Sequence, residues 1–136
     1  MADNPLVKKM KLTPAARAAV LGGPPGYRRS LGLPARVDVS EKLSGRYDWI
    51  QVFLKTRPEL EARIGRTVKA LNPAGLLWIA FPKASSGIQT DLSRDKGWDS
   101  LKTHNLKWIG LISVDNDWSA FAVRPYKPGE ARQAFR

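Results

Sequence analysis

The stretch Tyr47–Asp95, YDWIQVFLKTRPELEARIGRTVKALNPAGLLWIAFPKASSGIQTDLSRD, decides the fold of this chain. It begins with a nearly continuous apolar run, Trp49–Leu54, which is typical of a strand that is covered on both faces. A second apolar run, Gly75–Phe81, follows after a segment with helical periodicity. Strand, helix and strand in this order predict a βαβ unit with a right-handed crossover.

The segment between these two strands carries the signals of a capped helix. Thr56 and Glu59 have the spacing of a capping box, in which the hydroxyl accepts from the amide three residues later and the carboxylate reaches back. Apolar residues then recur along one helical stripe, which predicts the buried face of the helix. The stripe consists of Leu60, Ile64, Val68 and Leu71. We expect the helix to stop at Asn72-Pro73, because the residue before proline avoids the α region.

Shorter patterns on either side extend this unit. Ala16–Leu21 lies before a Gly- and Pro-rich loop and predicts a first strand, and the alternation in Arg36–Ser40 predicts another short strand. Trp108–Val114 and Trp118–Val123 predict a closing antiparallel hairpin. The order of elements indicates an α/β fold with a mostly parallel sheet.

Two brief helices, over 27–31 and 94–104, complete the expected architecture and would place helices on both faces of the sheet. The chain divides into a flexible segment 1–12, a single domain 13–125 and a basic tail 126–136. A chain of 136 residues is long enough for one domain with its own hydrophobic core.

Composition narrows the classes of function. The net charge of +11 favours contact with polyanions, although a solvated basic surface explains it equally, and no nucleic-acid motif is present. The absence of cysteine excludes thiol catalysis and thiolate metal sites and fits a cytoplasmic protein. No apolar run reaches the length of a membrane span, so we expect no membrane association. Trp49, Trp78 and Trp108 lie in apolar strand patterns and are expected in the core rather than on a base-stacking surface.

The runs YDWIQVFL and LNPAGLLWIAFP, with the capped helix between them, resemble the second half of a class I methyltransferase. The expected hairpin resembles the last two strands of that family, one of which is antiparallel. The segment Pro82–Asp95, PKASSGIQTDLSRD, is similar to a signature of a small bacterial family of unknown function with a shortened methyltransferase-like fold. The resemblance implies a shortened Rossmann-like, methyltransferase-type sheet. It implies no particular reaction, because the function of that small family is unknown.

The N-terminal half departs from the methyltransferase pattern. That family has an acidic-x-G-x-G-x-G loop after its first strand, whereas this chain has VLGGPPGY at Val20–Tyr27, without the acidic residue and with two prolines that remove backbone amides. Ala74 also stands where the family usually has a glycine. Asp38 is the candidate for the acidic residue that would hold the ribose, with Asp48 as a further one if folding places it suitably.

A candidate ligand site lies in the loop that follows the second buried strand. Ligands of open α/β sheets bind outside the carboxyl ends of the strands, and this loop is rich in cations and hydroxyls. We predict an anion site there, built from Lys83, Ser85, Ser86, Thr90, Asp91 and Arg94. The competing interpretation is that the serines, Thr90 and Asp91 are turn formers and helix caps, with Lys83 and Arg94 paired to nearby aspartates.

No constellation in the sequence marks a catalytic or metal site. His104 is the only histidine and is expected near a helix end, where histidine more often caps carbonyls than activates a serine. Asp91, Asp95 and Asp99 lack a metal-binding pattern and are expected on a solvated face.

These observations favour a non-catalytic binding module with no cofactor and an anionic ligand or polyanion as its partner. The first alternative is an S-adenosylmethionine-dependent methyltransferase with an atypical loop at Gly22–Gly26. The second alternative is a basic protein that associates with RNA or DNA.

Overall fold

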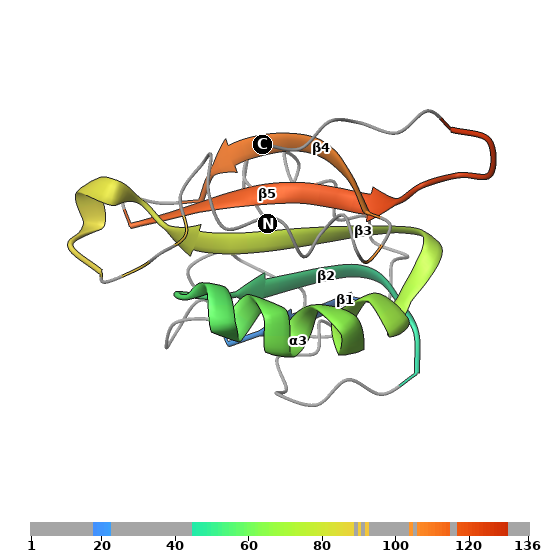
Figure 1. The fold of residues 1–136 in the computed structure, drawn as a ribbon, viewed down its shortest axis with the longest axis horizontal. Coiled ribbons are helices and arrows are strands. Elements are labelled where there is room, and N and C mark those ends of the chain that lie inside the picture. The colour runs from blue at the N-terminus through green and yellow to red at the C-terminus, as the bar shows by residue number, and fades with distance from the viewer. Residues whose placement is uncertain are drawn as a thin grey trace, which may run out of the picture.

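A computed structural model describes residues 18–22, 45–88, 90, 92, 104, 106–114 and 117–130 of the chain. The elements in chain order are β1 (Ala18–Leu21), β2 (Tyr47–Phe53), α3 (Arg57–Lys69), β3 (Leu71–Pro82), the 3-10 turn η1 (Ala84–Ser86), β4 (Leu106–Ser113) and β5 (Trp118–Pro125). The strands form one sheet in the order β1-β2-β3-β5-β4 (Figure 1). No helix among these residues is both long and apolar enough to cross a bilayer.

The sheet is parallel on one side and antiparallel on the other. β1 pairs with β2 and β2 with β3 in parallel, so these three strands end at the same side of the molecule. β5 lies between β3 and β4 and is antiparallel to both. The predicted βαβ unit and the closing hairpin are therefore confirmed, and the hairpin places its second strand, rather than its first, beside β3.

The capping box forms at the start of α3 with a small shift. The Thr56 hydroxyl accepts from the amide of Glu59 at 3.3 Å, as predicted. The Glu59 carboxylate reaches the amide of Lys55 at 3.2 Å, one residue before the N-cap. The Thr56 hydroxyl thus satisfies an amide that the first helical turn leaves without a partner, while Glu59 bonds the residue before the cap.

The expected end of the helix is wrong. α3 ends at Lys69, and Leu71 is the first residue of β3 rather than the last apolar residue of the helical stripe. The pairing of β2 with β3 jumps from Tyr47↔Leu71 to Trp49↔Leu76, so a bulge absorbs the extra residues of β3. Proline is tolerated in such a bulge, which explains why Asn72-Pro73 lies inside a strand.

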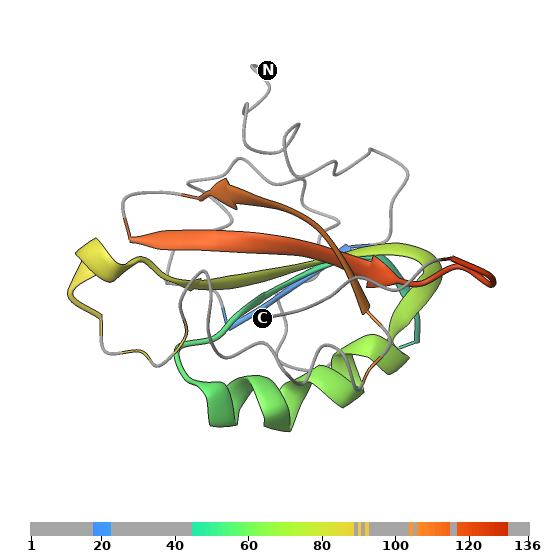
Figure 2. The same ribbon diagram turned by 45° about the horizontal axis from the view of Figure 1, so that its top comes forward.

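The two faces of the sheet pack differently. On one face of the sheet lies α3 (Figure 2). It contributes Leu60 and Ile64 to a core that also contains Ile79 and Phe121. The opposite face combines large aromatic rings with small side chains and is also buried. Its buried members are Ala18, Val20, Trp49, Phe53, Trp78, Ala80, Trp118, Ala120 and Ala122. The brief helices expected over 27–31 and 94–104 fall outside the described residues, apart from His104, as does the strand at 36–40.

Two of the three tryptophans expected in the core are buried there. Trp49 and Trp78 are 2% and 3% exposed. Trp108 is 39% exposed, so its prediction as a core residue is wrong. The reason is the position of β4 at the edge of the sheet, where the Trp108 ring makes a T-shaped contact with Phe121 at 4.9 Å.

Candidate anion site at the carboxyl end of the sheet

The candidate site lies at the carboxyl end of the sheet, by which we mean the side where β1, β2 and β3 end. Gly22 follows β1, Lys55 follows β2, and Lys83 follows β3 at this side. The antiparallel hairpin adds Ser113, at the end of β4, because Ser113 pairs with Ser119 at the start of β5. Segments distant in sequence thus end on the same side of the sheet as η1, at the left of Figure 1.

Lys83 is the cation that the fold fixes most firmly at this end. Its amide donates to the carbonyl of Asp117 at 2.8 Å, which continues the ladder between β3 and β5. Its ammonium donates to the hydroxyl of Ser113 at 2.6 Å. A hydroxyl orients the ammonium without neutralising it, and no carboxylate pairs with Lys83 in the described part of the chain.

The hydroxyl of Ser86 is used within its own turn. It donates to the carbonyl of Lys83 at 2.7 Å and accepts from the amide of Ile88 at 3.1 Å. Gly87 closes the turn in the left-handed conformation, with φ of 78°. Ser85, by contrast, is exposed in the middle of η1. The competing interpretation, in which these serines form turns, therefore holds for Ser86. Ser85 remains exposed.

Thr90 has a comparable local role. Its hydroxyl accepts from the amide of Leu92 at 3.0 Å and donates to the carbonyl of the same residue at 3.4 Å. Leu92 is 2% exposed and belongs to the core on the α3 face, so this turn directs the chain back into the interior. Asp91 and Arg94, the remaining members of the predicted site, fall outside the described residues.

Gly22 begins the loop that a methyltransferase would use for its cofactor. Its φ of 67° is left-handed, and a Cβ at this position would lie 3.2 Å from the carbonyl oxygen of Phe53. Both features explain why glycine occupies this position. Asp48 cannot supply the acidic partner at this end, because it lies at the start of β2, where its carboxylate accepts from the side-chain amide of Asn72 at 2.7 Å. Asp38 and the rest of the loop, 23–26, are outside the described residues.

His104 lies against α3. A Cβ at Gly65 would be 3.3 Å from Cε1 of His104, so the imidazole packs on the helix where a glycine leaves room for it. No hydrogen bond among the described residues joins His104 to Ser85 or Ser86. The same residues contain no group of carboxylates and histidines that could hold a metal ion. Asp91, Asp95 and Asp99 are not among them.

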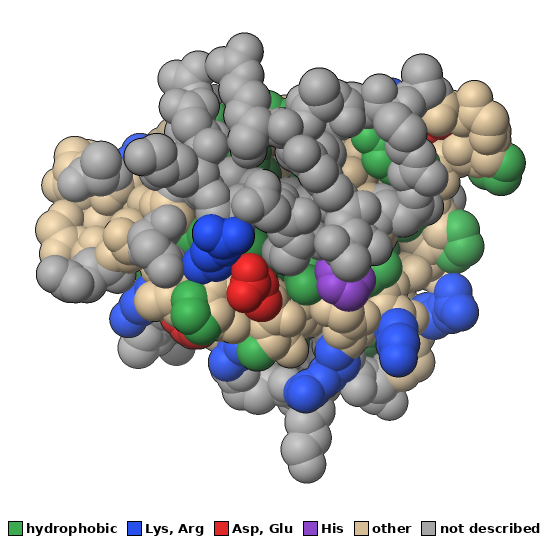
Figure 3. Space-filling view, viewed as in Figure 1, with side chains coloured by type: hydrophobic (Ala, Val, Ile, Leu, Met, Phe, Trp, Pro, Cys, Tyr) green, Lys and Arg blue, Asp and Glu red, His purple; other side chains and the backbone are tan. Residues whose placement is uncertain are grey.

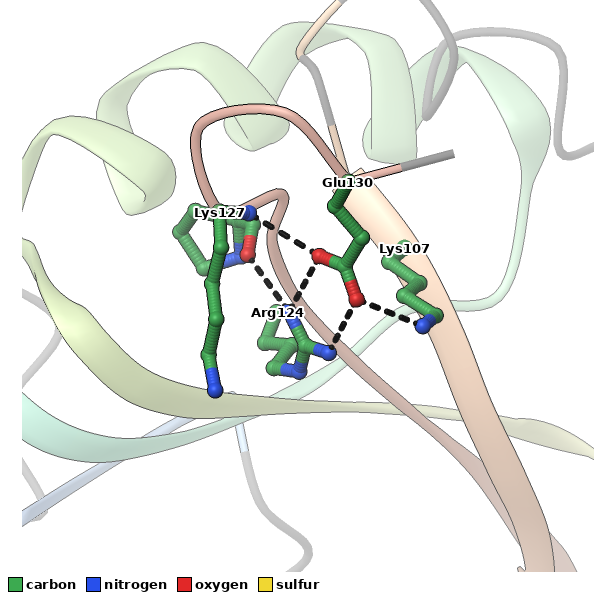
Figure 4. A network of polar contacts seen from close by, with 5 residues as sticks. Lys107, Arg124, Lys127 and Glu130 are labelled. Atoms are coloured by element: carbon green, nitrogen blue, oxygen red, sulfur yellow. Dashed lines mark hydrogen bonds and ion pairs between the residues drawn. The ribbon is translucent and has the colours of Figure 1, made fainter. Parts of the chain in front are cut away.

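A second polar cluster, at the opposite end of the sheet, was not predicted. Glu130 accepts from both terminal nitrogens of Arg124, at 3.0 and 2.8 Å, and from the ammonium of Lys107 at 2.6 Å (Figure 4). The amide of Lys127 adds a further bond at 2.9 Å. These bonds, that of Arg124 above all, hold the pKa of the Glu130 carboxyl well below its usual range.

The sequence contained one signal of this cluster. Lys107 and Arg124 occupy paired positions of β4 and β5, and a Pro-Gly turn follows shortly after β5. A carboxylate just past such a turn is well placed to meet both cations, but the register of the hairpin had to be known first.

Comparisons with known proteins show the fold. Neither the family models nor the curated proteins contain a match to this chain. Among solved structures, the ribosomal protein L11 methylase of Lactobacillus delbrueckii subsp. bulgaricus has a TM-score of 0.57 at 12% identity, over 88% of this chain and 75% of that protein. The B. subtilis tRNA methyltransferase TrmK has a TM-score of 0.55 at 11% identity, over 93% of this chain and 67% of that protein.

The mitomycin 7-O-methyltransferase MmcR gives a TM-score of 0.56 at 14% identity. The match covers 89% of this chain but only 45% of MmcR, so the chain spans less than half of that enzyme. At such identities the likeness concerns the arrangement of the elements and not the residues that act. The chain therefore has a shortened, methyltransferase-like Rossmann fold of the α/β class, closed by an antiparallel hairpin.

Proposed function

We propose that this protein is a non-catalytic binding module that holds an anionic group at the carboxyl end of its sheet, with Lys83 as the central cation. The observation that carries the proposal is the contact between the Lys83 ammonium and the Ser113 hydroxyl at 2.6 Å. It fixes a positive charge at the end of the sheet where open α/β folds bind ligands, and no carboxylate of the described residues neutralises that charge.

Neighbouring groups suit an anion as well. Ser85 is exposed in η1, next to Lys83, and can donate its hydroxyl. Lys55 follows β2 at the same end and adds positive charge. The net charge of +11 attracts anions to the molecule in general, and the carboxyl end gives that attraction a defined position. We extend the site to Asp91 and Arg94 on the strength of the sequence pattern alone.

The test is calorimetric titration with inorganic pyrophosphate at moderate ionic strength. Lys83→Ala should weaken binding about tenfold or more, since charge-assisted hydrogen bonds to anions are strong. Lys69→Ala is the matched control, because it removes the same charge from an exposed position at the other end of α3. Equal losses in both variants would mean that pyrophosphate senses only the overall charge, and the proposed site would be wrong.

A second candidate function is that of an S-adenosylmethionine-dependent methyltransferase. The left-handed Gly22, which closely approaches the carbonyl of Phe53, favours it, because a cofactor loop needs a glycine of this kind after the first strand. The described residues supply that glycine and lack the acidic residue for the ribose at this end. The fit to the cofactor is therefore incomplete, and the candidate depends on Asp38.

Titration with S-adenosylhomocysteine separates the two functions. Micromolar affinity that Asp38→Asn abolishes would favour the methyltransferase, whereas no heat at millimolar ligand would favour the binding module. A generic single-stranded RNA belongs in the same series. Affinity for RNA that falls steeply with salt and is unchanged in Lys83→Ala would instead indicate a basic nucleic-acid-associated protein.

A further inference from the structure

The outer edge of β4 is the most exposed apolar surface in the described part of the chain. Trp108, Ile109 and Leu111 are 39%, 41% and 37% exposed, and they are the large apolar residues that the fold leaves open. β4 is the last strand of the sheet, so no described strand neighbours its outer side. Such an edge presents backbone donors and acceptors that an added strand can use.

A bulge divides β4 into two parts. Trp108 pairs with Val123 and Gly110 with Ala122, so Ile109 has no residue opposite it. From Gly110 to Ser113 the register with β5 is regular. This regular part carries no charged side chain, whereas edge strands usually carry charges that prevent further pairing.

Cations flank this apolar edge at both ends. At its carboxyl end the ammonium of Lys83 lies 2.6 Å from the hydroxyl of Ser113. At its amino end Glu130 is the acceptor for Lys107 and Arg124, and one carboxylate neutralises only one of these two charges. The ammonium of Lys127 extends away from Glu130 and adds a further positive charge there (Figure 4).

We propose that the outer edge of β4 binds an extended peptide segment with an apolar centre and acidic ends, which adds a strand to the sheet beside Gly110–Ser113. Strand addition supplies the backbone bonds, and Leu111 with Ile109 supplies the apolar contact. Eight residues of strand span about 26 Å, so acidic side chains at the two ends of one short segment reach both groups of cations.

Charge favours such a partner over a second copy of this chain. Antiparallel pairing of two β4 strands would bring the Lys83 end of one copy next to the Lys107 end of the other. Cations would then face cations, and each copy carries a net charge of +11. An acidic segment places opposite charges at the same two positions, which adds to the affinity and speeds association.

The probe is a synthetic capped peptide of about nine residues, the length of a long strand, with alternating valine and threonine in its centre and two acidic residues at each end. We expect saturable binding by calorimetry. Hydrogen exchange of the protein should slow within 106–113 when the peptide is added. A peptide methylated on alternate backbone nitrogens should bind at least tenfold more weakly, because it cannot complete the ladder.

Leu111→Lys tests the edge itself and should weaken binding about tenfold, because it removes an apolar contact from an exposed position that tolerates replacement. Glu61→Gln is the control: it raises the net charge by the same amount on the exposed side of α3 and should leave the affinity unchanged. The proposal shares the cation Lys83 with the anion site and rests on it to that extent, whereas the apolar contact of Leu111 belongs to the edge alone. Leu111→Lys should therefore weaken peptide binding and leave pyrophosphate affinity unchanged, which distinguishes a failure of the edge from a failure of the anion site.

Three results would overturn the proposal. Equal binding of the N-methylated peptide would show that no strand is added. Equal binding of a peptide with lysines in place of its acidic residues would show that the cations do not select the partner. A dimer of the unliganded protein in sedimentation equilibrium, abolished by Leu111→Lys, would show that a second copy occupies the edge instead.

Discussion

The two ends of the sheet use the same kinds of side chain for different purposes. At the amino end, where β1, β2 and β3 begin, Arg124 and Lys107 share the carboxylate of Glu130, which neutralises one of their two charges. At the carboxyl end, the ammonium of Lys83 donates to the hydroxyl of Ser113, and no carboxylate of the described residues pairs with it. A cation with a carboxylate partner holds the fold together, whereas a cation held by a neutral group can still bind an anion.

Figure 3 illustrates a third situation, in which basic side chains simply cover the surface. Lysines and arginines are scattered over this face of the molecule, with few acidic side chains between them. Exposed charges of this kind contribute little to stability individually. The difference between the three situations lies in the partner of each cation and not in the number of cations.

The largest effect is expected from the bulge at the amino end. A Cβ at Gly75 would lie 2.7 Å from Cδ1 of Leu71 and 2.9 Å from the backbone oxygen of Asn72, so Gly75→Ala should cost about 1–3 kcal/mol of unfolding free energy. Gly110→Ala is the control, because nothing lies within 4 Å of its Cβ position. Urea denaturation of both variants measures the difference. Equal stability of the two variants would mean that the bulge relaxes freely.

The next effect concerns the helix that begins at the carboxyl end. Thr56→Ala removes the hydroxyl that accepts from the amide of Glu59 and should cost about 1 kcal/mol. Thr56→Ser keeps this acceptor and should retain most of the stability. Thermal unfolding followed by circular dichroism compares the two variants. A loss of the same size in Thr56→Ser would assign the role to packing of the methyl group instead.

Glu130→Gln removes the negative charge that Arg124 and Lys107 share at the amino end of the sheet. It should lower the melting temperature more than Glu61→Gln does, because Glu130 bonds three basic residues whereas Glu61 pairs with one described residue, Arg57, on an exposed helix surface. The pKa of the Glu130 carboxyl is depressed in the folded state, so its contribution is complete above the ordinary carboxylate pKa of 4.5.

Because the pKa of the Glu130 carboxyl is lowered in the folded state, its contribution to stability should fall as the pH falls. As pH falls below 4.5 toward the lower pKa of the folded state, the unfolded chain takes up the proton first, and the advantage of wild type over Glu130→Gln should shrink. Unfolding measured between pH 7 and pH 3 tests this expectation, with Glu61→Gln beside it. A difference that stays constant over the whole range would contradict the role of the Glu130 charge.

The smallest effect on stability is expected from Lys83→Ala, although its effect on anion binding should be large. Removing a cation whose ammonium bonds a hydroxyl, and no carboxylate of the described residues, should change the unfolding free energy by no more than about 0.5 kcal/mol. Urea denaturation beside the pyrophosphate titration gives both quantities for one preparation. A strongly destabilised Lys83→Ala would place Lys83 with the structural cations of the amino end.

The elements that sequence patterns predicted correctly are those whose interactions are local. The capping box joins residues three and four positions apart, and the alternation within each strand reports its own faces. The end of α3 was predicted wrongly, because an apolar residue after a helix fits the helical stripe and the next strand equally well. Only the pairing of Leu71 with Tyr47 distinguishes the two.

Sequence patterns alone predicted the strand–helix–strand unit, the hairpin and the capping role of Thr56, because neighbours along the chain make these bonds. For Ser86 and Thr90 the same patterns left turn formation open as the alternative to an anion site. The tertiary structure decided the order of the strands. β5 lies between β3 and β4, which exposes Trp108, brings Lys83 to Ser113 across 30 residues and brings Lys107 to Glu130 across 23. Local propensity does not encode such contacts, since they depend on which strands become neighbours when the two cores are buried.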